Sequence, residues 1–190
     1  MKTIKQIFAN NGPVAKALDH YEKRHEQITL SQAVEDTMEQ GGVLLGEAGT
    51  GTGKTIAYLV PAMMSGHTVV ISTGTKNLQE QIFFKDIKFL QKALGLDIRV
   101  AYLKGQDNYL CKTRMDSFIS SPACLSYTPS EVSELSKWSN TTKTGDRMEL
   151  AGLTDNSKIW SEVCSTKETR IGQRCPNADE CFVGLARRKA

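Results

Sequence analysis

The stretch Gly46-Glu47-Ala48-Gly49-Thr50-Gly51-Thr52-Gly53-Lys54-Thr55 decides how the first half of this chain is interpreted. Closely spaced glycines let a backbone curl until its N–H groups converge on phosphate oxygens. In such a loop Lys54 supplies a cation to the β- and γ-phosphates, and the Thr55 hydroxyl ligates Mg²⁺. Ala48 occupies the first position of the usual GxxxxGK[ST] pattern, which is a permitted variation. The sequence therefore predicts a Walker A phosphate loop at residues 48–55.

The segments on both sides of this loop have the order expected of a nucleotide-binding α/β fold. Residues 43–45 form a short apolar run typical of a buried strand, and residues 55–64 have helical periodicity. The β-branched run at 68–72 and the run at 98–103 predict two further strands, with a one-sided helix at 76–94 between them. We therefore expect a RecA-like P-loop NTPase with a parallel sheet and helices on both faces.

The composition changes at about Lys104-Gly105. From there to about Cys181 the chain is rich in polar residues, its apolar periodicity is weak, and it contains all five cysteines. A segment that buries little apolar surface needs another source of stability, and clustered cysteines indicate a metal or a cluster. The residues alone leave an iron–sulfur cluster, a zinc ion and free thiols open, although the Cys-x₂₋₄-Cys pair of structural zinc sites is missing.

The overall composition is that of an ordinary globular protein. Of 190 residues, 39% are hydrophobic and 24% are charged, and the net charge is 24 − 21 = +3, which permits an anionic partner. No apolar run approaches the roughly 20 residues of a membrane helix, and Met1–Asn10 lacks the features of a signal peptide. We expect a cytoplasmic protein without a membrane partner.

Adenine is the expected base, and the acidic partner of the phosphate loop is not found. A guanine site would need an Asn-Lys-x-Asp element, and Thr75-Lys76-Asn77-Leu78 has the wrong order. The Mg²⁺-holding carboxylate should follow an apolar strand, but Asp86 lies within a predicted helix and Asp179-Glu180 follow no such strand. Binding of ATP and Mg²⁺ is therefore expected, with the catalytic acid outside this chain.

Several segments taken together resemble one family. They are Arg24-His25-Glu26-Gln27, the phosphate loop, Ser72-Thr73-Gly74-Thr75-Lys76-Asn77-Leu78-Gln79-Glu80-Gln81 and Leu103-Lys104-Gly105-Gln106-Asp107-Asn108-Tyr109-Leu110-Cys111. Over about residues 21–189 the chain is similar to the DinG-type bacterial helicases, relatives of XPD in helicase superfamily 2. This resemblance implies ATP-driven 5′→3′ unwinding of DNA in repair or replication, at the bacterial nucleoid. It also implies a mostly helical [4Fe–4S] domain inserted into the first motor domain.

The resemblance also implies domain limits and roles for particular residues. Residues 1–104 would begin the motor domain, 105–185 would form the cluster domain, and 186–190 would start the return to the motor. The nucleotide-binding residues that it adds to the loop are Arg24, Gln27 and Glu47. The residues that it places on the DNA backbone are Thr73, Thr75 and Asn77. The cluster ligands that it implies are Cys111, Cys164, Cys175 and Cys181, which leaves Cys124 as a spare thiol.

Basic and aromatic residues interleave near the cysteines, as suits single-stranded DNA. The cations that we select for DNA contact are Lys112, Arg114 and Arg170. With the resemblance, the expected partners are single-stranded and forked DNA, and replication or repair proteins not identified by the sequence.

The chain also departs from the family. Gly74 stands where a His is common, and the Walker B acid and second motor domain are missing, so we interpret the chain as the N-terminal part of a longer helicase. The alternatives are a non-motor adaptor that binds ATP, zinc and nucleic acid, and a small P-loop kinase, for which no lid-like Arg cluster is recognisable. Iron content separates the helicase from the adaptor.

Overall fold

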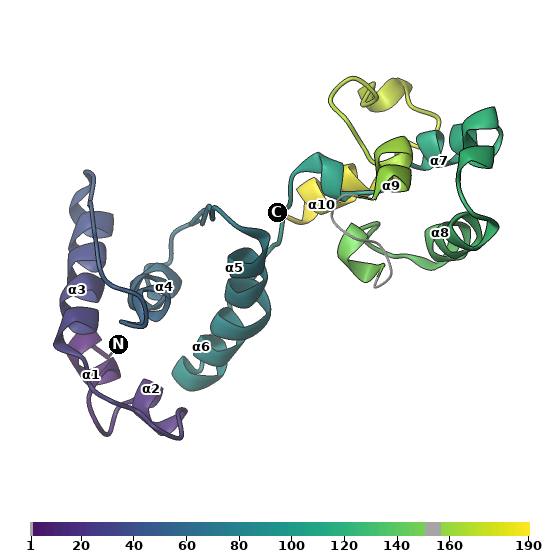
Figure 1. Cartoon of the computed structure of the whole chain (residues 1–190). Coiled ribbons are helices and arrows are strands. Elements are labelled where there is room, and N and C mark those ends of the chain that lie inside the picture. The colour runs from purple at the N-terminus through teal and green to yellow at the C-terminus, as the bar shows by residue number, and fades with distance from the viewer. Residues whose placement is uncertain (1, 151–156) are drawn as a thin grey trace. The chain divides into compact units, whose positions relative to one another are not determined.

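The computed structural model describes residues 2–150 and 157–190, whose course is shown in Figure 1. The chain divides into two compact units, residues 1–100 and 101–190. Each unit has its own cluster of buried hydrophobic side chains. The division falls close to the change in composition at Lys104-Gly105.

Unit 1 is built from helices joined by irregular segments. Its helices are α1 (Ile4–Ile7), α2 (Pro13–Lys16), α3 (His25–Gln40), α4 (Lys54–Met64), α5 (Lys76–Gln81) and α6 (Ile87–Leu94). α3 packs closely against α4, and the side chains of Leu59 and Val60 on α4 are completely buried (Figure 1). The helices predicted at 55–64 and 76–94 are thus confirmed.

The second of these helices contains a π-helical turn, Ile82–Asp86, between α5 and α6. Ile82, Ile87 and Leu90 are all buried in the unit 1 core. Ile82 and Ile87 are five positions apart in the chain, and this spacing would place their side chains on different faces of a regular α-helix. The wider turn, with its i→i+5 spacing, returns Ile87 to the buried face.

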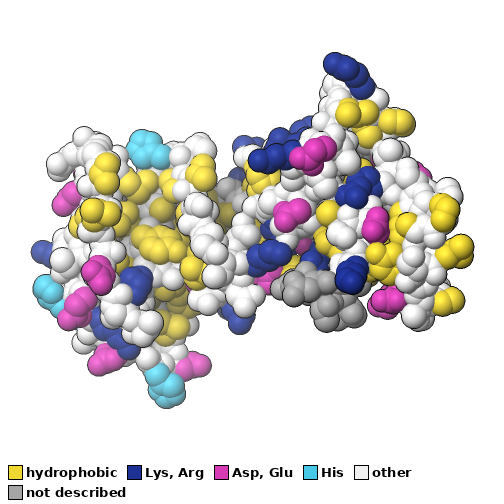
Figure 2. Space-filling model, turned by 45° about the horizontal axis from the view of Figure 1, so that its top comes forward, with side chains coloured by type: hydrophobic (Ala, Val, Ile, Leu, Met, Phe, Trp, Pro, Cys, Tyr) yellow, Lys and Arg dark blue, Asp and Glu magenta, His cyan; other side chains and the backbone are white. Residues whose placement is uncertain are grey.

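The predicted parallel sheet is not confirmed. Within the described residues there is no strand, and the segments 43–45, 68–72 and 98–103 are irregular. The expectation of a buried first strand is wrong for this chain, because Val43 is 92% and Leu45 is 94% exposed. Hydrophobic side chains (yellow) are visible at the surface of unit 1, at left in Figure 2. A β-branched sequence becomes a strand only when a neighbouring backbone supplies a regular ladder of hydrogen bonds.

Unit 2 consists mostly of helices and short 3₁₀ turns, and the family resemblance implied a mostly helical domain in this part of the chain. Its α-helices are α7 (Lys112–Ile119), α8 (Pro129–Thr141), α9 (Lys158–Val163) and α10 (Phe182–Lys189). Short 3₁₀ turns lie at Gln106–Asn108, Pro122–Ser126, Arg147–Glu149 and Gly172–Arg174. α8 begins with a capping box, in which Thr128 and Glu131 bond each other's backbone amides and Pro129 occupies the first turn.

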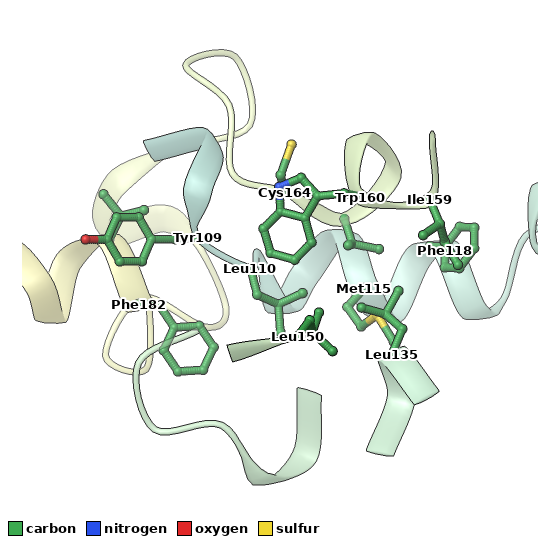
Figure 3. Close-up of a cluster of buried hydrophobic side chains, with 12 residues drawn as sticks. Tyr109, Leu110, Met115, Phe118, Leu135, Leu150, Ile159, Trp160, Cys164 and Phe182 are labelled. Atoms are coloured by element: carbon green, nitrogen blue, oxygen red, sulfur yellow. The ribbon is translucent and has the colours of Figure 1, made fainter. Parts of the chain in front are cut away.

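The core of unit 2 gathers side chains from all four α-helices (Figure 3). Met115 and Phe118 of α7, Leu135 of α8, Trp160 of α9 and Phe182 of α10 belong to this buried cluster. The described part of the chain has no helix that is both long and apolar enough to cross a bilayer.

A short extended segment at residues 109–111 ties unit 2 together. The Leu110 amide donates to the Gly145 carbonyl and the Cys111 amide to the Val163 carbonyl, both at 2.8 Å. The Ser165 amide donates to the Tyr109 carbonyl at 2.8 Å. Leu110 and Cys164 form an isolated antiparallel bridge. Cys111 and Cys164, far apart in sequence, are therefore held on neighbouring backbone segments.

Candidate nucleotide site and cysteine cavity

The phosphate loop curls back on itself before α4 begins. Gly51 and Gly53 both have a φ of 78°, in the left-handed region that favours glycine. The Thr52 hydroxyl donates to the Gly49 carbonyl at 2.9 Å, which closes the turn. α4 starts at Lys54, directly after the loop. Its first amides and the positive end of its dipole therefore face the loop, as an anion site requires.

The Lys54 ammonium lies inside this curl. Its Nζ donates to the carbonyl oxygen of Gly49 at 2.6 Å and also to that of Ala48. Carbonyl oxygens are neutral acceptors, and a phosphate oxygen is a stronger partner for an ammonium group. Lys54 is thus held at the position from which it can transfer to the phosphates of a nucleotide.

Two side chains of the α3 region reach the same loop. Gln27 Nε2 donates to the Gly53 carbonyl at 3.1 Å, and Arg24 Nη1 donates to the Gly51 carbonyl. Farther along α3, the buried Ser31 hydroxyl donates to the Ala57 carbonyl of α4 at 2.6 Å. The structure therefore brings Arg24 and Gln27 together with the loop.

The remaining predicted residues of unit 1 have simpler surroundings. Glu47 is exposed just before the loop, and Thr55 is half-buried in the first turn of α4. Burial raises the pKa of Tyr58, and a hydrogen bond with the Thr55 side chain opposes that rise. Thr75 caps α5 by accepting from the Leu78 amide at 3.3 Å, a role that Thr before a helix often takes.

Three cysteines of unit 2 line one cavity of about 180 Å³. We call it the cysteine cavity; its walls include Cys111, Thr113, Ser165, Arg170, Cys175 and Cys181. Cys111 precedes α7, Cys181 precedes α10, and Cys175 follows a 3₁₀ turn. Burial raises the pKa of the Cys111 thiol, the amides of Arg114 and Thr113 lower it, and the nearby Cys175 and Cys181 raise it further.

Cys164 is buried and is not part of the cavity wall, although the next residue, Ser165, is. The Arg114 guanidinium donates to the Cys164 carbonyl at 2.6 Å and lies 3.8 Å from its sulfur. Burial raises the pKa of the Cys164 thiol, and the positive charge of Arg114 opposes that rise. Cys124, the expected spare, lies on a 3₁₀ turn and packs against the hydrophobic core.

The cysteine thiols can be compared with the arrangement that a single metal ion needs. Within residues 2–150 and 157–190, no three Cys, His, Asp or Glu side chains come close enough together to hold one metal ion. A tetrahedral zinc ion needs four donors at about 2.0–2.3 Å from one centre. In a [4Fe–4S] cluster each thiolate binds a different iron atom, so its donors lie farther apart.

The cations selected for DNA contact differ in how they are engaged. Lys112 forms an ion pair with Glu180, Arg114 holds Cys164, and Arg170 lines the cysteine cavity. Sequence reasoning missed the partners of Lys112 and Arg114 because they lie 68 and 50 residues away in the chain. It also missed the buried ion pair of Lys104 and Asp146, at 2.9 Å.

Comparison with known proteins adds the family. Residues 29–150, more than half of the chain, match the DEAD/DEAH box helicase family. The chain belongs to the DEAD/DEAH box helicase family. Membership implies a P-loop NTPase fold for its motor part, in agreement with the phosphate loop and α4.

The relatives of this helicase chain are much longer proteins. ATP-dependent DNA helicase YoaA of Haemophilus influenzae is 42% identical over 188 residues, covering 98% of this chain and 29% of the relative. ATP-dependent helicase DinG of Mycobacterium tuberculosis is 34% identical over 189 residues, covering 87% of this chain and 28% of the relative. The Bacillus subtilis relative, 3′-5′ exonuclease DinG, is 31% identical over 158 residues, covering 81% of this chain and 17% of the relative. The chain thus spans less than a third of the length of these relatives.

Proposed function

We propose that this chain is the ATP-binding part of an ATP-dependent DNA helicase of the DinG and YoaA type. The observation that carries the proposal is the connection of Gln27 and Arg24 to the carbonyls of Gly53 and Gly51. It joins the phosphate loop to side chains that, by family resemblance, recognise adenine. ATP and Mg²⁺ are the ligands that we assign to this site.

Each residue of the nucleotide site has a distinct task in this proposal. The loop amides and Lys54 bind the phosphates, the Thr55 hydroxyl ligates Mg²⁺, and Gln27 contacts the adenine edge. Glu47 and Arg24 support the loop from its two sides. Hydrolysis also needs a carboxylate that activates water and a cation from a second motor domain, and neither is recognised in this chain. We therefore expect nucleotide binding with very slow turnover.

A titration with Mg·ATP tests the nucleotide site. Lys54→Ala should lower the affinity at least tenfold, because it removes the cation that faces the phosphates. Lys76→Ala, at the exposed start of α5, is the matched control and should bind like the wild type. Equal affinity in Lys54→Ala and wild type would exclude this loop as the triphosphate site.

For unit 2 we propose a [4Fe–4S] cluster held by Cys111, Cys164, Cys175 and Cys181. Three of these cysteines, Cys111, Cys175 and Cys181, line one cavity, which supports a ligand shared between them. The cluster would join the chain segments of a unit with a modest core, and its redox state is available to one-electron chemistry. The alternative adaptor function has zinc in place of the cluster, and the Cys-x₂₋₄-Cys pairs of structural zinc sites are missing from the sequence.

Metal analysis of anaerobically purified protein tests the cluster. We expect about four irons per chain, lost on Ser substitution of any proposed ligand. Cys124→Ser should retain the iron, since Cys124 packs against the core instead. Stoichiometric zinc without visible absorption would favour the adaptor.

The third part of the proposal is contact with single-stranded DNA. The full-length helicase would move along this strand in the 5′→3′ direction during repair or replication. Thr73, Thr75 and Asn77 would serve it in unit 1. Lys and Arg side chains (dark blue) are prominent on unit 2, at right in Figure 2, and Arg170, Arg187 and Lys189 belong to that unit. Lys112 and Arg114 remain proposed contacts, but their partners within the chain make them poor choices for mutation.

A salt-dependent binding titration tests the DNA path. The double variant Arg187→Glu and Lys189→Glu should bind single strands more weakly and with a smaller salt slope, because fewer counterions are released. Its ATP affinity and iron content should match the wild type, since neither residue lines the cysteine cavity. Undiminished DNA affinity in an iron-loaded double variant would move the DNA path elsewhere.

A further inference from the structure

Three hydroxyl-bearing residues line the cysteine cavity together with its cysteines: Thr113, Ser165 and Thr169. The Thr169 hydroxyl donates to the Thr166 carbonyl at 3.3 Å. The other two are Thr113, in the first turn of α7, and Ser165, which directly follows Cys164. Neither residue is a cluster ligand. Their surroundings show where each hydroxyl can donate its proton.

The Thr113 hydroxyl is oriented by a neighbouring amide. Its Oγ1 lies 3.3 Å from Cys175 Sγ, and Asn177 Nδ2 donates to the same oxygen at 3.1 Å. Because the oxygen accepts from Asn177, the hydroxyl proton is free to point toward the sulfur of Cys175. Thr113 is therefore arranged as a donor to that sulfur.

The Ser165 hydroxyl has no hydrogen-bond partner among the described residues. Ser165 is 2% exposed, and among the described residues its Oγ is the one buried side-chain oxygen or nitrogen without a hydrogen bond. Leaving a buried hydroxyl without a hydrogen bond is unfavourable, because the group has lost its water partners on folding. Ser165 forms part of the cavity wall, so a group occupying the cavity would provide the missing acceptor.

We propose that Thr113 and Ser165 donate hydrogen bonds to sulfur atoms of the cluster or of its cysteine ligands and thereby raise its reduction potential. This inference rests on the cluster proposed above. Adding one electron makes the cluster more negative, so a hydrogen-bond donor stabilises the reduced form more than the oxidised form. The net free energy of a typical hydrogen bond corresponds to about a fivefold change in the equilibrium constant between the oxidised and reduced cluster. At 59 mV per tenfold change for one electron, this is about 40 mV for each hydroxyl.

A potentiometric titration of the anaerobic 190-residue chain, followed by electron paramagnetic resonance, tests the inference. Thr113→Val and Ser165→Ala should each lower the midpoint potential while retaining the iron. The expected shift corresponds to an approximately fivefold smaller equilibrium constant for reduction of the cluster. Thr113→Ser keeps a hydroxyl and should keep the wild-type potential. Asn177→Leu frees the Thr113 hydroxyl to rotate and should lower the potential by a smaller amount.

Matched controls come from α8. The hydroxyls of Thr141 and Ser139 donate to carbonyls of their own helix, those of Lys137 and Ser136. Thr141→Val and Ser139→Ala should leave the potential unchanged.

The outcomes separate the inference from the cluster assignment. A wild-type chain without iron would overturn the assignment, and the inference with it. Iron-loaded Thr113→Val and Ser165→Ala proteins with the wild-type midpoint would overturn the inference alone. If Thr113→Val does not retain iron, Asn177→Leu and Ser165→Ala decide the question, and an unchanged midpoint in both rejects it.

Discussion

Gln27 donates a hydrogen bond from its side-chain amide to the backbone carbonyl of Gly53, 26 residues away at the end of the phosphate loop. A Cβ atom on Gly53 would overlap Gln27 Nε2. Gly53 also has a φ of 78°, which L-residues with side chains rarely adopt. Glycine is therefore required at this position for the backbone conformation and for the space that Gln27 fills.

The first prediction concerns Gly53→Ala. Strain at positive φ and the overlap with Gln27 should together lower the free energy of unfolding by about 1–3 kcal/mol and weaken ATP binding. Chemical denaturation and nucleotide titration measure the two effects. Gly74→Ala is the control, because an added Cβ there meets nothing within 4 Å. Equal stability of the two variants would contradict this account of Gly53.

The second prediction concerns base recognition. Gln27→Ala should weaken ATP binding and reduce the preference for ATP over GTP, since the proposed adenine contact and the link to Gly53 are both lost. Competition of ATP and GTP for a fluorescent nucleotide measures the preference. Gln40→Ala, at the exposed end of α3, should leave it unchanged. An unaltered ATP preference in Gln27→Ala would assign base selection to other residues.

The third prediction concerns the turn at Gly145. Its φ is 65°, its carbonyl accepts from Leu110, and an added Cβ would overlap the ring of Phe182 in the unit 2 core. Gly145→Ala should lower the free energy of unfolding by about 2 kcal/mol or more. Gly172 has a similar φ of 63°, but an added Cβ there meets nothing within 4 Å. Gly172→Ala therefore measures the cost of backbone strain alone, without a steric overlap. Gly145→Ala should be the more destabilising of the two in urea titrations.

The fourth prediction concerns the buried ion pair of Lys104 and Asp146. The Lys104 side chain is 2% exposed and the Asp146 side chain 13%. Either Lys104→Met or Asp146→Leu alone should cost about 3–5 kcal/mol of stability, because the remaining charge loses its oppositely charged partner. The double variant should recover much of that loss, which a double-mutant cycle measures. Additive losses would show that the two charges act independently.

The sequence predicted features that depend on neighbouring residues in the chain. The glycines and Lys54 specify the phosphate loop locally, and the helix after it was predicted nearly to its ends. The strand prediction at 43–45 failed because a strand depends on backbone partners that a local apolar run cannot reveal. Val43 and Leu45 therefore lie exposed rather than in a sheet.

The same reasoning explains what was missed in unit 2. The family resemblance implied a shared site for Cys111, Cys164, Cys175 and Cys181, and the structure places all of these except Cys164 around one cavity. Charge alone assigned Arg114 to DNA, whereas its guanidinium bonds the carbonyl of Cys164, 50 residues away. The hydroxyls of Thr113 and Ser165 carry no sequence signal, since their importance comes only from the surfaces that they face.

The π-helical turn at Ile82–Asp86 makes one helix of this family member tolerant of a change in length. A π turn is equivalent to an α-helix with one residue inserted. Removing the exposed Lys85 would leave Ile82 and Ile87 four positions apart, so both would still face the core of unit 1. Removing a residue elsewhere between Lys76 and Leu94 would instead rotate everything after it by about 100°. An ancestral gain or loss of one residue can therefore be accommodated at this turn without repacking the core.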